Sequence, residues 1–292
     1  DETQLPAARS ALAAAAYENQ IYAIGGDAPT GVSALVERYD PNANTWTTLS
    51  SMPLPVADIA SAVIGGLIYV PGGRLASGAI TNTLAVYNPR QDRWEQRAPM
   101  PATLSGYALA AYEGKLYVFG GWDGQKYTAT VYAYDPVGDL WTTHSPMDQA
   151  RGFAAAAVAG GKIFVVGGTD GEKELALNSA FSPDAEASGD QAWEAHTPLP
   201  AGRSKFAMVS LADILHVIGG NGAGDPPTAL AYSPQLNVWE QLETPPLSGW
   251  TQLGVAAVGT NLYAFGGLNQ GAPTAAQWAY QALYTIAIPV VH

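Results

Sequence analysis

The side chains best suited to hold a polar ligand stand beside six glycine pairs that recur along the chain. Basic, aromatic, acidic and amide residues follow these pairs within two positions, at Arg74, Trp122, Asp123, Asp170, Asn221 and Asn269. Sixteen residues before the first glycine of four pairs stand Arg9, Arg151, Arg203 and Trp250. Arginine forks suit carboxylates and sugar hydroxyls, and aromatic faces suit sugar rings or apolar side chains. Gathered by a fold, these residues would form a binding surface on which four arginines make a local positive patch that favours an acidic ligand.

The glycine pairs define a repeat, and this repeat must position the side chains. The pairs are Gly25-Gly26, Gly72-Gly73, Gly120-Gly121, Gly167-Gly168, Gly219-Gly220 and Gly266-Gly267, at intervals of 47, 48, 47, 52 and 47 residues. An aromatic residue follows each pair by 12 to 14 residues, at Tyr39, Tyr87, Tyr134, Phe181, Tyr232 and Tyr280. A tryptophan then follows seven residues later, at Trp46, Trp94, Trp141 and Trp239. In the fourth unit Trp193 comes five residues late, so one insertion within 184–192 explains the long interval.

Each unit predicts four short β-strands. In the first unit we expect strands over 10–17, 20–24, 34–39 and 45–49, with reversals at 18–19 and 40–44, where Asn, Asp and Pro supply the turn conformations. A sustained 3.6-residue apolar period is missing from the sequence, so we expect very little helix. One four-stranded sheet cannot bury both of its faces, whereas six sheets stacked radially can.

The pattern resembles the kelch repeat. The segments 21–26 and 116–121 end apolar strands at a glycine pair, and Tyr39-Asp40-Pro41 runs on to Trp46 as in that family. The resemblance implies an all-β, six-bladed β-propeller of kelch type with four antiparallel strands in each blade. We expect a single domain over 1–292, with blades near 5–52, 53–100, 101–147, 148–198, 199–246 and 247–292. Residues 283–288 would form the outer strand of blade six, and the ring would close by face packing between blades one and six.

Strand direction predicts where the candidate residues lie. In an antiparallel blade the loops 2–3 and 4–1 emerge on the same face, so the residues after the glycine pairs share a rim around the channel mouth. Arg9, Arg151 and Arg203 would lie just inside this rim. The alternative is that these three arginines bond backbone carbonyls and tie the blades together. Four polar residues of the innermost strands are expected to line the channel: Asp58, Tyr107, Lys205 and Gln252. Asp58 and Lys205 could form an ion pair across the channel or act as acid and base.

The aromatic residues of the repeat are expected to pack between the blades. We expect the third-strand aromatics at 39, 87, 134, 181 and 232 to be mostly buried, together with the five tryptophans that follow them. His216 stands where other units have tyrosine or phenylalanine, so it is interpreted as a packing residue.

Composition excludes several classes of function. The formal net charge of -12 disfavours nucleic acid and anionic membranes as partners. Without cysteine, disulfides, thiolate metal sites and cysteine nucleophiles are ruled out. The four histidines are scattered over different units, so we expect neither a metal site nor a cofactor, and the chain lacks both a nucleophile elbow and a phosphate loop. An apolar run long enough to cross a bilayer is also missing.

Three classes of function stay open. The first, and the favoured one, is a binding module, acting as a monomer, that recognises a protein segment or a glycan on the rim. The second is a metal-free sugar mutarotase or epimerase resembling sialic acid mutarotase, which would need an arginine and an acid around a pocket. The third is a structural module of a larger exported protein. The low lysine content and acidic balance favour an exported bacterial protein over a cytoplasmic one.

Overall fold

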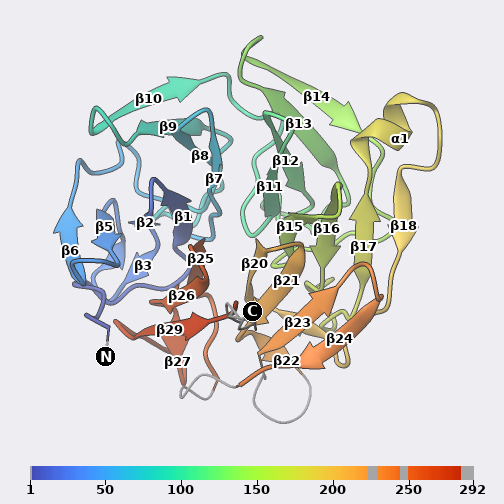
Figure 1. Cartoon of the computed structure of the whole chain (residues 1–292). Coiled ribbons are helices and arrows are strands. Elements are labelled where there is room, and N and C mark those ends of the chain that lie inside the picture. Colours follow the sequence, from blue (N-terminus) through green and yellow to red (C-terminus); the bar gives the residue numbers. More distant parts are fainter. Residues whose placement is uncertain (1, 223–228, 244–248, 284–292) are drawn as a thin grey trace, which may run out of the picture.

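The computed structural model describes residues 2–222, 229–243 and 249–283, and it consists of six small antiparallel sheets arranged radially around a channel (Figure 1). This arrangement confirms the predicted six-bladed propeller. Five blades contain four strands, and the described part of blade six contains three. No helix among the described residues is long and apolar enough to span a membrane.

Within each blade the strands run from the channel outward in sequence order. Blade one comprises β1 (Ala13–Tyr17), β2 (Gln20–Ile24), β5 (Val36–Asp40) and β6 (Thr45–Thr48). Blade two comprises β7 (Ala62–Ile64), β8 (Leu67–Pro71), β9 (Leu84–Asn88) and β10 (Arg93–Arg97). Blade three comprises β11 (Ala108–Tyr112), β12 (Lys115–Phe119), β13 (Val131–Asp135) and β14 (Leu140–His144). Blade four comprises β15 (Ala155–Ala159), β16 (Lys162–Val166), β17 (Asn178–Phe181) and β18 (Trp193–Ala195). Blade five comprises β20 (Ala207–Leu211), β21 (Ile214–Ile218), β23 (Leu230–Ser233) and β24 (Val238–Gln241). The described strands of blade six are β25 (Gly254–Val258), β26 (Asn261–Phe265) and β29 (Gln277–Gln281). Two short hairpins lie in the loops, β3 (Asp27–Ala28) with β4 (Gly31–Val32) and β27 (Leu268–Asn269) with β28 (Ala272–Pro273). A third two-residue pair, β19 (Arg203–Ser204) with β22 (Asn221–Gly222), joins the segment before β20 to the loop after β21.

The third-strand aromatics form the core between blades. The predicted burial of Tyr39, Tyr87, Tyr134, Phe181 and Tyr232 is confirmed, since all five are fully buried. Each packs on the tryptophan of its own fourth strand, with ring centroids 4.8–5.1 Å apart. Trp193 is buried, and Trp46, Trp94, Trp141 and Trp239 are only partly exposed, so the five tryptophans are mostly buried, as predicted. The four partly exposed tryptophans lie on outermost strands, where one side of the indole faces solvent.

The ring closes between blades six and one. A shared cluster packs Leu12 and Tyr39 of blade one against Tyr263 and Phe265 of blade six, as predicted. The N-terminal segment adds a backbone link, because the N–H of Leu5 donates to the carbonyl of Ala275 at 3.0 Å. Of the strand predicted over 283–288, all but the first residue lies outside the described residues.

A closed ring of backbone hydrogen bonds surrounds the channel. Six equivalent residues, one from each blade, have left-handed φ angles of 52–57°: Ala11, Asp58, Gly106, Phe153, Lys205 and Gln252. Each N–H donates to the carbonyl of the preceding member, and Ala11 donates to Gln252, at 2.5–3.0 Å. We call these six residues the axial ring. It fixes the blades to one another through the main chain.

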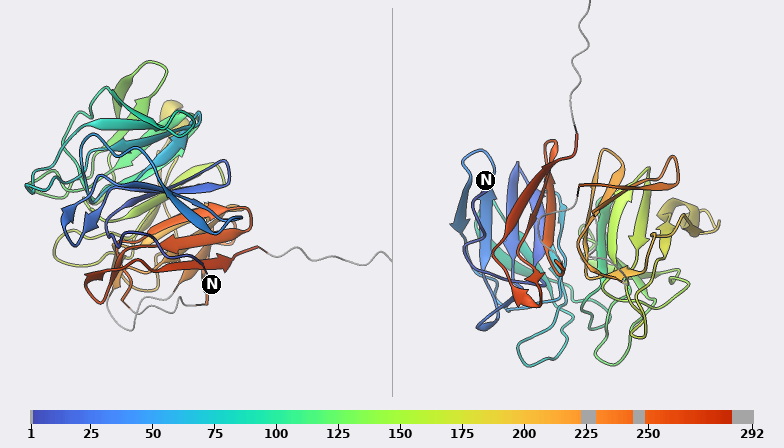
Figure 2. Two further views of the ribbon diagram at one scale, coloured as in Figure 1. Left: turned by 90° about the vertical axis from the view of Figure 1, so that its left-hand side faces the viewer. Right: turned by 90° about the horizontal axis from the view of Figure 1, so that it is seen from below.

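The one helix of the described residues, α1 (Pro183–Ala187), overlaps the predicted insertion and lies at the outer edge of blade four (Figure 2). Glu186 on this helix accepts hydrogen bonds from the backbone N–H of Ser145 and from Nδ1 of His144, both at 2.5 Å. Blade three makes the equivalent contact with blade two, where the backbone N–H of Ala98 donates to Asp139. Asp139 also accepts a hydrogen bond from the hydroxyl of Tyr134. Blade four has Phe181 in place of that tyrosine, and the carboxylate comes from the inserted helix.

Glu186→Gln is expected to lower the free energy of unfolding by about 1–2 kcal/mol at neutral pH. Burial alone would raise the pKa of Glu186, but the hydrogen bonds from Ser145 and His144 outweigh it and hold the pKa below 4.5. A lowered folded-state pKa stabilises the fold above the unfolded-state pKa, and this stabilisation is lost as the pH falls through the folded-state value. In urea unfolding the difference between variant and wild type should therefore shrink below pH 4.5. A difference that stays constant in acid would contradict this assignment.

Candidate functional site at the channel mouth

One face of the propeller carries the residues that follow the glycine pairs. In every blade an antiparallel bridge joins the 4–1 connection to the first residue after the pair, for example Ser10 to Asp27, Ala57 to Arg74 and Ser105 to Trp122. Blade five makes the same contact through Ser204 and Asn221. Loops 2–3 and 4–1 therefore share a face, as the strand order predicts, and the axial ring lies at its centre.

The arginines expected inside the rim are buried. Arg9 has no exposed surface, and its Nε donates to the carbonyl of Gly25 while Nη1 donates to Glu37 at 2.5 Å. Arg203 similarly donates to the carbonyl of Gly219, and Arg151 donates to the carbonyl of Val165. These bonds lie within the blades, so the prediction that Arg9, Arg151 and Arg203 help to form a positive surface patch is wrong. Glycine carbonyls that end second strands need a donor, and a long side chain from the 4–1 segment reaches them.

Trp250 occupies the same position and is also buried, with 1% of its surface exposed. Its Nε1 donates to the carbonyl of Gly266 at 2.5 Å, which is the bond that Arg9 makes to Gly25. The indole therefore replaces an arginine as an internal donor. The prediction that Trp250 is an exposed ligand contact is wrong.

Arg74 lies at the channel mouth but is already paired. Its Nε donates to Asp58 at 2.6 Å, and its Nη2 donates to Asp27. Gln252 contacts the other carboxylate oxygen of Asp58 at 3.4 Å. Two carboxylates thus surround one guanidinium, so the expected positive patch is neutralised. Asp58 and Lys205 do not form the ion pair that was one possibility for them, because these residues belong to blades two and five and lie on opposite sides of the axial ring.

An aromatic cluster occupies the other side of the mouth. Trp122 contacts Tyr127 with ring centroids 5.1 Å apart, and Tyr127 contacts Phe153 at 6.4 Å. The ammonium of Lys205 lies 5.1 Å from the centroid of Phe153, a cation–π contact. Among the described residues no carboxylate pairs with Lys205. The close approach requires glycine at 152, where a Cβ would lie 2.6 Å from the ring of Tyr127.

Of the other predicted rim residues, Asp123 and Asp170 support loops. Asp123 accepts hydrogen bonds from the backbone N–H groups of Lys126 and Gln125, which hold its pKa below the ordinary value. Asp170 does the same with Lys173 and Glu172, and it also binds the side chain of Gln149. Asn221 is exposed on the face, and Asn269 is half-buried. These four residues surround the mouth without contacting one another.

The channel encloses about 500 Å³ and is lined by the six innermost strands. Alanines dominate the lining, with Asp58, Lys205 and Gln252 at the mouth. Tyr107 also borders the channel, but it is buried and its hydroxyl donates to the carbonyl of Pro71. Tyr107 therefore lines the channel as predicted, but its hydroxyl is bonded within the protein. The polar chemistry is concentrated at the mouth and not along the channel wall.

Sequence reasoning missed three residues of this site: Asp27, Tyr127 and Phe153. Asp27 occupies the same position in unit one as Arg74 in unit two, so the repeat already pointed to it. Phe153 is the only aromatic member of the axial ring. Once one position of this ring is known, the spacing of the repeat identifies Phe153 as the ring residue of blade four. Tyr127 has no such signal, because the length of the 2–3 loop varies between blades.

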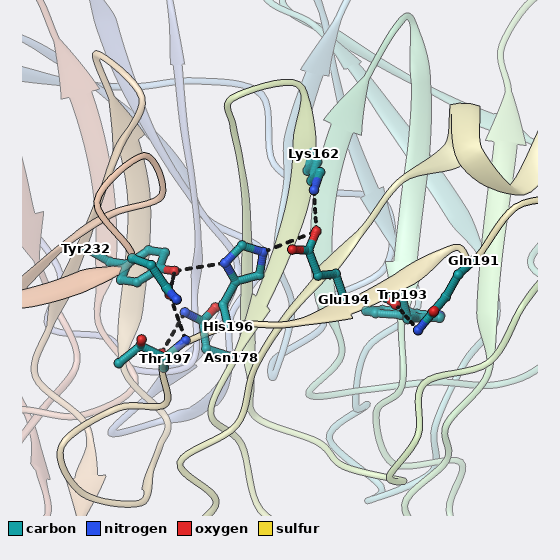
Figure 3. A network of polar contacts seen from close by, with 9 residues as sticks. Lys162, Asn178, Gln191, Trp193, Glu194, His196, Thr197 and Tyr232 are labelled. Atoms are coloured by element: carbon teal, nitrogen blue, oxygen red, sulfur yellow. Dashed lines mark hydrogen bonds and ion pairs between the residues drawn. The ribbon is translucent and has the colours of Figure 1, made fainter.

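A second polar network lies away from the mouth, between blades four and five (Figure 3). Nδ1 of His196 lies 3.1 Å from the hydroxyl of Tyr232, and Nε2 lies 3.7 Å from Glu194, which also pairs with Lys162. The ring of His196 packs edge-on against Phe164. Buried His216 packs in an inner strand pair, as interpreted from the sequence, and burial lowers its pKa. Across the described residues, no group of three or more His, Asp or Glu side chains could hold a metal ion.

Comparison with known proteins places this geometry in a family. Residues 1–187 match the family model described as the Attractin/LZTR1 β-propeller. The chain belongs to this family. Kelch-like proteins are among the relatives of this Attractin/LZTR1-type propeller: Kelch-like protein terF of Aspergillus terreus is 37% identical over 79 residues, which is 26% of this chain and 17% of that protein. Kelch-like protein 35 of Mus musculus is 37% identical over 67 residues, 23% of this chain and 12% of that protein. The chain thus matches less than a fifth of the length of these relatives.

Beta-scruin of Limulus polyphemus is also similar to this propeller, with 37% identity over 70 residues, 24% of this chain and 8% of that protein. The solved structure of YjhT superposes with a TM-score of 0.79 and covers 93% of this chain and 94% of that chain at 17% identity. At that identity the likeness shows the fold alone. The kelch-type propeller predicted from the repeat is confirmed.

Proposed function

We propose that this propeller is a binding module that holds a segment of a protein partner across the channel mouth. Kelch propellers are typically protein-binding modules. The observation that carries the proposal is the contrast within the axial ring: six residues share one backbone conformation, yet their side chains are all different. If these positions only closed the propeller, the same small residue could occupy all six of them. Recognition of a ligand, in contrast, needs side chains of different chemistry.

The two sides of the mouth suggest what the partner segment offers. The half-buried Trp122 with Tyr127 and Phe153 provides an aromatic surface suited to one large apolar side chain. Lys205 can donate to a carbonyl or carboxylate beside it, and the carboxylates of Asp27 and Asp58 can accept from backbone N–H groups. Binding energy in such interfaces concentrates on buried aromatic and charged anchors. Because Arg74 is already paired, the ligand needs one acceptor group and not a run of acidic residues.

Trp122→Ala and Lys205→Met are each expected to weaken ligand binding at least about tenfold. The probe is a peptide selected from a random display library on the wild-type protein, and its affinity is measured by fluorescence polarisation. Lys162→Met is the matched control, because Lys162 pairs with Glu194 between blades four and five, away from the mouth. It should leave the affinity unchanged. Equal affinities of wild type and both mouth variants would refute the site.

A sugar ligand is the competing outcome. A glycan array on the same proteins would reveal it as a signal that depends on Trp122, and sialic acid mutarotation followed by NMR would test the enzyme alternative. Acceleration of mutarotation that is lost in Asp58→Asn would replace the binding proposal with a catalytic one. A protein that binds neither peptides nor glycans at the mouth would favour the structural module of a larger exported protein.

A further inference from the structure

The buried arginine of blade four lacks the counter-charge that its blade-one equivalent has. Arg9 pairs with Glu37 at 2.5 Å, and neither side chain is more than 3% exposed. Arg151 stands at the same repeat position and is 2% exposed. Its Nη2 donates to the carbonyl of Val165 and to the hydroxyl oxygen of Ser179, each at 3.3 Å. These are long bonds to neutral acceptors.

Strand register shows that Ser179 replaces the carboxylate. In blade one Glu37 is the cross-strand partner of Ala23, and in blade four Ser179 is the partner of Val165. Serine has a hydroxyl where glutamate has its second methylene and its carboxylate, so it is shorter and carries no charge. The position that the Glu37 carboxylate takes beside Arg9 therefore has no equivalent protein group beside Arg151.

Two further donors of Arg151 are unsatisfied. Nε and Nη1 are buried and have no hydrogen-bond partner among the described residues. Asp148 acts on the guanidinium only at longer range and forms no ion pair with it. Burial lowers the pKa of Arg151 to about 10, so the group still carries its charge at neutral pH. A buried charge without a partner is strongly unfavourable, which calls for an anion at this place.

We propose that Arg151 binds a small inorganic monoanion, chloride in ordinary salt, where blade one has the carboxylate of Glu37. The ion accepts from Nη1 of Arg151, the nitrogen that in Arg9 donates to Glu37, and the hydroxyl of Ser179 is placed to donate to it. A water molecule could accept the same N–H groups but would not neutralise the guanidinium. The carbonyl of Arg151 accepts from the N–H of Gly121, so the ion lies beneath the aromatic side of the mouth.

Anomalous diffraction tests the site directly. The protein would be purified and crystallised in bromide throughout, so that slow exchange into a buried site cannot hide occupancy. The expected result is an anomalous peak within about 3–4 Å of Nη1 of Arg151, on the side where Arg9 has the carboxylate of Glu37. A site that refines as water without anomalous signal, or bromide found only at the surface, would overturn the proposal.

Thermal unfolding with chloride replaced by gluconate at constant ionic strength provides the second test. The wild-type melting temperature should rise by about 2–4 °C at chloride tenfold above its Kd. Ser179→Glu supplies the carboxylate and should abolish this chloride dependence, whereas Ser179→Ala removes only the hydroxyl donor and should shift the dependence to higher chloride concentrations without abolishing it. Arg151→Met should also abolish it, and this variant decides the question if Ser179→Glu fails to fold. The same chloride dependence in Arg151→Met as in wild type would show that the effect arises elsewhere.

Discussion

Arg9→Met is expected to lower the free energy of unfolding by about 3–5 kcal/mol. The substitution removes the guanidinium that pairs with Glu37 and leaves a carboxylate of 3% exposure without a counter-charge. It also removes the donor to the carbonyl of Gly25, which ends β2. Breaking one half of a buried pair costs far more than the intact pair contributes, because the remaining charge must be desolvated alone. Urea unfolding followed by tryptophan fluorescence measures the loss.

Two controls separate charge from packing in this experiment. The double variant Arg9→Met/Glu37→Met removes both charges and should recover most of the lost stability. Arg90→Met breaks the pair with Glu18, whose side chains are 71% and 54% exposed, and should have no measurable effect. A double variant as unstable as the single one would show that the shape of the arginine matters and its charge does not.

Gly120→Ala is expected to destabilise the propeller by about 3–5 kcal/mol. Gly120 has a φ of +58°, and a Cβ there would lie 2.3 Å from the carbonyl oxygen of Arg151 and 2.7 Å from the terminal methyl of Met147. That carbonyl accepts the hydrogen bond from Gly121, which joins blade three to blade four. The methyl group must therefore displace a backbone that holds two blades together.

The matched control is Gly114→Ala. Gly114 has a φ of +74°, but no atom lies within 4 Å of where its Cβ would be. Only the conformational cost of about 1 kcal/mol should remain. Equal losses at the two positions, measured by chemical unfolding, would show that backbone conformation and not the approach of the blades requires glycine at 120.

The fold could be predicted because its signals are backbone requirements that recur. Gly120 and its equivalents are needed wherever one blade approaches the next, and Tyr134 and its equivalents fill the space between blades. Such requirements repeat every 47 or 48 residues and leave a pattern in the sequence. The insertion in blade four was visible for the same reason, since it displaced Trp193 from the pattern.

The site was harder to predict because the type of a residue does not determine the direction in which its side chain points. An arginine at position 9 or 151 has the same neighbours in sequence whether it points to solvent or to the carbonyls of a glycine pair. Trp250 was the clue, because an aromatic residue that shares a position with arginines indicates a buried donor. The pair of Arg74 with Asp27 was within reach, since both follow a glycine pair in adjacent units. The contact of Asp58 with Arg74 could not be predicted, because it depends on the left-handed backbone conformation of Asp58 in the axial ring.

The axial ring also determines how this protein can change. Every link in it is made by main-chain atoms, so replacing one of its side chains leaves the closure of the propeller intact. The positions can therefore be diversified with little effect on folding, provided that each new residue tolerates a left-handed φ, which disfavours β-branched side chains. Positions 106 and 153 must be varied together, because a Cβ at Gly106 would lie 2.8 Å from the ring of Phe153. A combinatorial library restricted to these positions would sample new specificities on an unchanged scaffold.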